Sequence, residues 1–84
     1  MVHVSVKIQL KDGMLDPQGE TLGHALTALG YEGVDQVRVG KWITFDVAGD
    51  VDDETRSRVD EMCRRLLANP VVERYTFDLQ AVPS

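Results

Sequence analysis

Hydrophobic and polar residues alternate strictly along the first ten positions of the chain. Every even-numbered residue from 2 to 10 is valine, isoleucine or leucine, and every odd-numbered residue from 3 to 11 is polar. A period of two places the apolar side chains on one face of an extended strand. The pattern therefore predicts a half-buried strand over residues 2–10, and Asp12-Gly13 indicates a turn after it.

Two later segments have the helical period. In the first, Asp16 is a good N-cap and Pro17 suits the first helical position. An apolar stripe at i, i+3, i+4 and i+7 follows, formed by Leu22, Ala25, Leu26 and Leu29. These features predict a helix over 17–29. A second helix is indicated from the acidic residues 52–54 to Arg64 and Arg65, because this charge order complements the helix dipole.

Three further stretches have strand character. They contain Val34, Val37 and Val39, then Ile43, Phe45 and Val47, and finally Tyr75, Phe77 and Leu79. Gly40-Lys41 suits a two-residue hairpin between the first two stretches. The resulting order β-α-β-β-α-β predicts one α+β domain over residues 1–84. Its expected fold is ferredoxin-like, with a four-stranded antiparallel sheet and both helices on one face.

Size and charge limit the function classes. A chain of 84 residues buries only about 60–65% of its unfolded surface, so we expect a homo-oligomer, either a dimer or a dimer of dimers. The net charge is −5 and there is no basic stripe, which disfavours nucleic-acid binding. The single cysteine rules out an intrachain disulfide, and no apolar run approaches membrane-spanning length. We expect a cytoplasmic location and no membrane partner.

The residues that most often carry chemistry do not form a recognisable site. His3 falls on the polar face of the first strand and His24 on the solvent side of the first helix. Cys63 lies on the apolar face of the second helix, where it is expected to be a core residue. Four acidic residues of the second helix each have an arginine four residues later, which is typical of a solvated helix surface. The pairs are Asp52–Arg56, Glu54–Arg58, Asp60–Arg64 and Glu61–Arg65. The sequence predicts no catalytic residue, no metal site and no cofactor in this chain.

Polar residues in the turns remain as candidate partner contacts. The candidates are Lys11, Asp16, Gln18, Arg38 and Lys41. Turn and cap chemistry explains Asp16 well but explains Gln18, Arg38 and Lys41 poorly, because many polar residues would serve at those positions. We therefore expect these last three to contact another protein.

Three segments resemble a known family. They are residues 4–19, with the run Leu-Asp-Pro-Gln-Gly; residues 37–41, Val-Arg-Val-Gly-Lys; and residues 63–75, with Leu-Ala-Asn-Pro-Val. Together they resemble the small S subunit of phosphoribosylformylglycinamidine synthase, the PurS family, over about residues 2–80.

The resemblance implies a non-catalytic subunit of a glutamine-dependent ligase in purine biosynthesis. In that complex a glutaminase subunit frees ammonia, and a large synthetase subunit uses ATP and Mg to convert formylglycinamide ribonucleotide into the amidine. The small subunit is expected to bridge these two partners and to assist ammonia transfer. An alternative is a ferredoxin-like module that senses a ligand between subunits; tight binding of an amino acid or nucleotide by the isolated chain would favour it.

Overall fold

The computed structural model describes residues 1–83. The elements follow the order β1 (Val2–Leu10), α1 (Pro17–Ala28), β2 (Gly40–Val47), α2 (Asp53–Met62), a π-helical turn η1 (Cys63–Leu67) and β3 (Glu73–Ala81). Both predicted helices and the first, third and last predicted strands are therefore present. Asp16 and Asp52 cap the two α-helices, each accepting a hydrogen bond from the backbone N–H three residues later.

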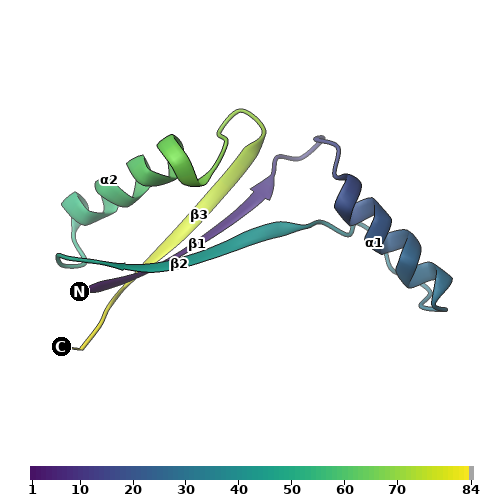
Figure 1. Cartoon of the computed structure of the whole chain (residues 1–84), viewed down its shortest axis with the longest axis horizontal. Helices are drawn as coiled ribbons and strands as arrows, with labels where there is room; N and C mark the ends of the chain where they lie inside the picture. Colours follow the sequence, from purple (N-terminus) through teal and green to yellow (C-terminus); the bar gives the residue numbers. More distant parts are fainter. Residues whose placement is uncertain (84) are drawn as a thin grey trace.

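The sheet is antiparallel and has the order β2-β1-β3. Val6 of β1 lies opposite Ile43 of β2 on one side and opposite Phe77 of β3 on the other. The first strand of the chain is thus the central one, and both of its edges are occupied. Its even-numbered residues face α2, which covers one face of the sheet (Figure 1).

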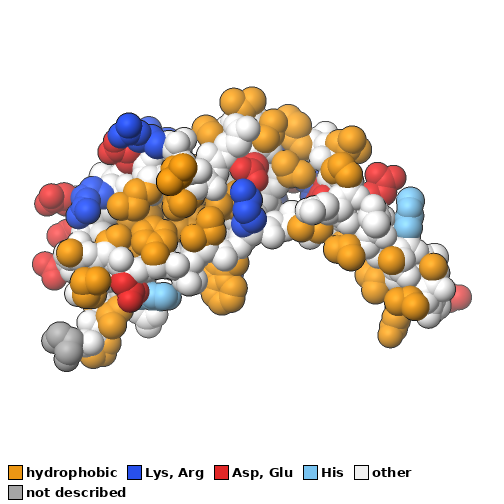
Figure 2. All heavy atoms as spheres, viewed as in Figure 1, with side chains coloured by type: hydrophobic (Ala, Val, Ile, Leu, Met, Phe, Trp, Pro, Cys, Tyr) orange, Lys and Arg blue, Asp and Glu red, His pale blue; other side chains and the backbone are white. Residues whose placement is uncertain are grey.

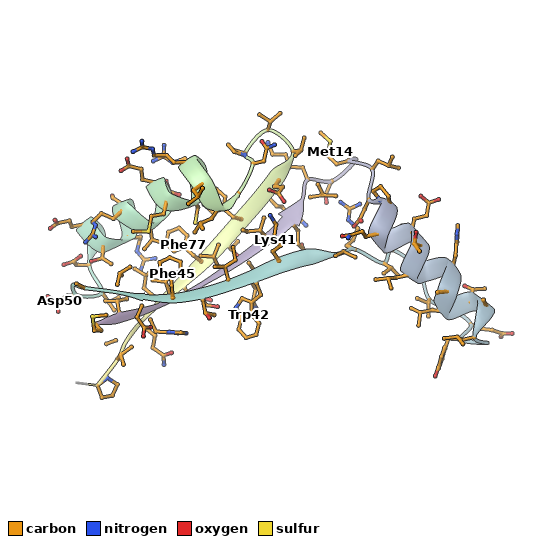
Figure 3. All side chains as sticks on the ribbon, in the orientation of Figure 1. Met14, Lys41, Trp42, Phe45, Asp50 and Phe77 are labelled. Atoms are coloured by element: carbon orange, nitrogen blue, oxygen red, sulfur yellow. The ribbon has the colours of Figure 1, made fainter. Side chains whose placement is uncertain are left out.

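The hydrophobic core lies between this face and α2. Its fully buried side chains come from β1, α2 and the start of η1, and they are Val2, Val4, Val6, Ile8, Val59 and Cys63. Partly buried residues of β2 and β3, including Phe45 and Phe77, pack against them. In Figure 3 both of these phenylalanines point toward α2. The apolar residues whose alternation predicted the first strand therefore form the centre of the core.

Polar contacts fix α2 on the sheet. The Tyr75 hydroxyl of β3 donates a hydrogen bond of 2.6 Å to Asp60 Oδ1, and Arg64 Nε donates one of 2.9 Å to Asp60 Oδ2. Arg65 also pairs with Glu61 at 3.0 Å, in the predicted i, i+4 arrangement. The hydrogen bond from Tyr75 lowers the pKa of Asp60, and Arg64 contributes in the same direction.

The expectation that both helices lie on one face of the sheet is wrong. Helix α1 projects from the end of the sheet instead of packing on it (Figure 1). The molecule is elongated, measuring 48 × 29 × 15 Å, and Figure 2 shows it as an arch with α1 forming one limb. We call the sheet with α2 and η1 the body, and residues 14–39 the arm.

The expected four-stranded sheet is also wrong, because within residues 1–83 the sheet has three strands. Residues 34–39 do not join it. Gln36 has a positive φ of 56°, which interrupts an extended conformation, and its N–H donates to the Asp35 side chain. Gly40-Lys41 forms the start of β2 instead of a hairpin turn. Because residues 34–39 run straight into β2, they cannot fold back to pair with it.

Candidate functional site

The junction between arm and body is held by a carboxylate that bonds to two separate segments. Asp16 Oδ1 accepts a hydrogen bond of 2.8 Å from the Gly19 N–H, and its Oδ2 accepts one of 2.9 Å from the Val39 N–H. These two bonds lower the pKa of Asp16, and the nearby Arg38 guanidinium acts in the same direction. Asp16 therefore caps α1 and ties it to the backbone that enters β2.

Arg38 spans the same junction. One terminal nitrogen donates to the Met14 carbonyl at 3.3 Å, and the other donates to the carbonyls of Leu10 and Lys11, each at 3.3 Å. Its Nε lies 3.9 Å from Asp16 Oδ2. The side chain thus connects the end of β1 to the start of the arm. Its contacts are intrachain contacts that orient α1.

The arm itself is closely packed at one glycine. Gly19 lies so close to the returning segment that a Cβ built on it would be 2.2 Å from the Val37 carbonyl oxygen and 2.9 Å from Asp16 Oδ2. At Gly23, one turn later, a Cβ would lie 3.6 Å from a Val37 methyl group, which is an ordinary contact. Only glycine at position 19 lets the chain return along α1 at this distance.

The remaining candidate contacts are spread around the junction. Lys41 is the second residue of β2, and its Nζ lies 3.8 Å from Glu73 Oε2 of β3. Gln18 is exposed and lines a shallow hollow with Leu22 and Val39. Lys11 is exposed in the turn after β1. The structure thus brings Asp16 and Arg38 together, and it leaves the three others on the surface nearby.

Most of the apolar stripe of α1 is exposed, although Leu26 is partly buried. Leu22 is 50% exposed and Leu29 is 75% exposed, and Tyr31 beyond the helix is 61% exposed. Along α1 the one buried residue is Gly19. In Figure 2 hydrophobic side chains gather along the lower side of this limb of the arch. A contiguous apolar surface of this kind is typical of a protein-binding site.

Sequence reasoning missed this surface because it assumed that the stripe packs on the chain's own sheet. The signal was the same in both cases, since an amphipathic helix looks identical whether its apolar face meets its own sheet or another protein. A second sign was available in the sequence. The predicted strand with Val34, Val37 and Val39 is preceded by Gly33 and interrupted by Asp35-Gln36, which argues against a strand in this segment.

The face of the sheet opposite α2 is open and mainly polar. Trp42 points away from α2 on this face and is 71% exposed (Figure 3). Its indole N–H donates a hydrogen bond to the Ser5 hydroxyl on the neighbouring strand. His3 and Asp46 also pair across strands, with 2.7 Å between Nδ1 and Oδ1. We call this surface the open face.

The histidines and the cysteine lie on different elements, with His3 on β1, His24 on α1 and Cys63 at the start of η1. Burial raises the pKa of the Cys63 thiol, which keeps it in the unreactive protonated form. Within residues 1–83 no three His, Cys, Asp or Glu side chains form a group that could hold a metal ion. None of the described helices has the length and apolarity needed to cross a membrane.

These features define a class of protein: a small α+β domain with a hydrophobic core in its body and an arm whose apolar residues are largely exposed. Residues 3–81 match the model of the PurS family, described as phosphoribosylformylglycinamidine (FGAM) synthase. The chain belongs to the PurS family, whose members are subunits of FGAM synthase in purine biosynthesis. The resemblance noted from the sequence is therefore confirmed.

Two curated relatives match over nearly their whole length. The PurS subunit of phosphoribosylformylglycinamidine synthase from Methanocaldococcus jannaschii is 37% identical, with 98% of this chain and 99% of the relative covered. The corresponding subunit from Bacillus subtilis is 39% identical, with 98% and 96% covered.

Solved structures agree with these matches. The B. subtilis PurS structure has a TM-score of 0.88 at 38% identity, with 96% of this chain and 100% of that chain covered. A chain of the PurLQS structure from Thermotoga maritima has a TM-score of 0.82 at 28% identity, with 95% and 99% covered.

Proposed function

We propose that this chain is the non-catalytic subunit that brings the glutaminase and ATP-dependent synthetase subunits of FGAM synthase together. The observation that carries the proposal is the uncovered apolar side of α1, in a chain that belongs to a family of complex subunits. The Thermotoga maritima relative is part of a PurLQS structure, which supports the same role here.

The proposed contribution to chemistry is assistance with ammonia transfer. In the proposed reaction the glutaminase releases ammonia, and the synthetase uses ATP and Mg to activate formylglycinamide ribonucleotide for attack by that ammonia. Ammonia that escapes into neutral water becomes mainly ammonium, which has no free electron pair. A closed path between aligned sites preserves the nucleophile and raises its effective concentration. We place this reaction in the cytoplasm.

The contact region we propose for these partners surrounds the junction. Lys11, Gln18 and Lys41 offer exposed polar side chains there. Asp16 and Arg38 act indirectly, because their intrachain hydrogen bonds set the direction in which α1 leaves the body. This revises the simpler expectation that Arg38 itself reaches a partner.

We also propose that the chain forms a homo-oligomer, either a dimer or a dimer of dimers. The described body has few fully buried side chains, and the apolar stripe of α1 is open to solvent. A chain of this size is marginal as a monomer, so a second copy that covers apolar surface stabilises it.

Reconstitution with separately purified glutaminase and synthetase subunits tests the main proposal. Glutamine-dependent FGAM synthesis should require this chain, whereas synthesis supplied with a high concentration of ammonium salt should depend on it much less. The chain alone should turn over neither glutamine nor ATP. Full glutamine-dependent activity in its absence would contradict the proposal.

A further inference from the structure

The end of the second helix exposes a leucine that a regular α-helix would bury. Val59 and Cys63 are fully buried against the sheet. Leu66 comes seven residues after Val59 and three after Cys63, a spacing that places all three on one face of an α-helix. Leu66 is nevertheless 84% exposed, the highest value for a large hydrophobic side chain within residues 1–83.

The π-helical turn η1 explains this exposure. The Ala68 N–H donates a hydrogen bond of 2.9 Å to the Cys63 carbonyl, five residues earlier instead of four. Because a π-helix fits more residues into each turn, every residue rotates less around the axis. Leu67 packs against the core and Ala68 is buried, whereas Leu66 turns to solvent. Single π-helical turns at the end of an α-helix are frequent at functional sites.

Arginine side chains flank the exposed leucine on the outer side of α2. Arg58, Glu61, Met62 and Arg65 line a shallow hollow of about 290 Å³, and Leu66 directly follows Arg65. Figure 2 shows Lys and Arg side chains in blue over α2. We call Arg58, Met62, Arg65 and Leu66 the η1 patch. It is an apolar centre with a basic rim, the arrangement that protein interfaces commonly have.

The charge of the η1 patch differs from that of the chain as a whole. Arg65 pairs with Glu61 at 3.0 Å, but the expected pair of Arg58 with Glu54 is not among the ion pairs within residues 1–83. The patch therefore carries an excess positive charge on a chain whose net charge is −5. A partner segment that bears carboxylates is attracted to this patch and repelled by the chain elsewhere.

We propose that the η1 patch binds an acidic amphipathic segment of one of the two partner subunits. In this complex an apolar side chain of that segment lies on Leu66 and Met62, and its carboxylates face Arg58 and Arg65. A subunit that bridges two others needs two separate contact surfaces. The arm supplies one, and the η1 patch on the body supplies the second.

This inference rests on the proposed bridging function and names one of the surfaces that the function uses. The two can fail separately. If glutamine-dependent synthesis does not require this chain, the bridging function fails. If synthesis requires the chain but is unaffected by changes in the η1 patch, only the present inference fails.

Substitution of the exposed leucine is the first test. Calorimetric titration of the full chain with separately purified glutaminase and synthetase measures both affinities. Leu66→Ala should weaken binding to one of the two subunits about tenfold or more, and the urea midpoint should stay unchanged because the side chain is solvent-exposed. Val51→Ala is the control, since Val51 is an exposed hydrophobic residue just before the opposite end of α2. It should leave both affinities unchanged.

Charge reversal tests the basic rim. Arg58→Glu should weaken binding to the same subunit about tenfold, and the loss should shrink as salt concentration rises because salt screens the repulsion. Arg58→Lys keeps the charge and should retain most of the affinity. Arg56→Glu is the matched control: it makes the same charge change on α2 at an exposed residue that lines a different hollow, with Asp53. It should bind as the wild type does.

Three results would overturn the proposal. The first is wild-type affinity of Leu66→Ala and Arg58→Glu for both subunits. The second is an equal loss in Arg56→Glu and Arg58→Glu, which would reduce the effect to the overall charge of the chain. The third is a loss confined to self-association, measured by sedimentation of the chain alone, which would assign the η1 patch to a second copy. Circular dichroism of every variant confirms that the chain is folded.

Discussion

The body and the arm use apolar residues in opposite ways. In the body, Val2, Val4, Val6 and Ile8 are at most 1% exposed beneath α2. In the arm, Leu22 of α1 and Leu29 at its C-cap are at least half exposed. The same kind of sequence pattern therefore produces a core in one region and a surface in the other.

This difference separates stability from assembly. Burial of side chains against α2 contributes to the free energy of folding of the chain itself. The exposed stripe of α1 contributes only when another protein covers it. Substitutions in the two regions should therefore be detected by different measurements.

The largest effect on folding is expected at the centre of the body. Ile8→Ala removes a side chain with no exposed surface and should lower the free energy of unfolding by about 2–5 kcal/mol. Leu29→Ala, at a side chain 75% exposed, should change it by less than about 0.5 kcal/mol. Urea unfolding at one fixed, low protein concentration measures both. Equal losses would show that the arm packs on the chain's own body.

Substitutions in the arm should affect binding to other proteins more than they affect the stability of the chain. Leu22→Asp places a charge on the apolar stripe and should weaken binding to the covering protein about tenfold or more, because burying a carboxylate without a partner is costly. Glu20→Asp is a control at an exposed first-turn residue of the same helix that already carries a carboxylate. Size-exclusion chromatography with the partner subunits, and sedimentation of the chain alone, report the change. Wild-type behaviour of Leu22→Asp in both would contradict a binding role for the stripe.

A smaller effect is expected where the arm is closely packed. Gly19→Ala places a Cβ 2.2 Å from the Val37 carbonyl oxygen, so the returning segment must shift, at a cost of about 1–3 kcal/mol. Gly23→Ala places its Cβ 3.6 Å from a Val37 methyl group and serves as the matched control. Hydrogen exchange should become faster over residues 14–39 in the Gly19 variant while the strands stay protected. Unchanged exchange there would mean that the arm tolerates the displacement.

The smallest effect is a loss of stability in acid. Hydrogen bonds lower the pKa of Asp60, through Tyr75, and of Asp52, through Thr55, below the ordinary value of 3.8. A lowered pKa in the folded state stabilises the protein above that value, and this contribution is lost as the pH falls below it. The urea midpoint should therefore drop between pH 5 and pH 3.

Asparagine variants show which carboxylates are responsible for this pH dependence. Asp60→Asn should lower the midpoint at pH 5 and flatten its dependence on pH, because the group no longer titrates. Asp50→Asn, at an exposed position, should leave the dependence as in the wild type. Parallel curves for Asp60→Asn and the wild type would show that Asp60 makes no such contribution.

Much of the body could be predicted because its signals are local. The alternation from Val2 to Leu10 identified the central strand and its buried face, and Asp16 was identified as the cap of the first helix. The acidic residues 52–54 were assigned to the first turn of the second helix, where Asp52 is in fact the cap. Each of these features depends on residues within one or two turns of chain.

The junction was harder to interpret. Asp16 was identified as a cap, but its second hydrogen bond goes to Val39, 23 residues away. The sequence did not reveal that Arg38 donates to three backbone carbonyls, because they lie 24 to 28 residues earlier in the chain. Contacts between residues so far apart in the sequence depend on how the chain folds back after α1, and a local sequence pattern does not predict this.

The sequence by itself determined the strand and helix segments of the body, the cap at Asp16 and the family. Only the tertiary structure decided that there are three strands within residues 1–83 and that α1 leaves the body. The physical reason is that β1 has both edges occupied, by β2 and β3, while residues 34–39 continue into β2 without reversing. An amphipathic helix specifies that one side must be covered, and the path of the chain decides which protein covers it.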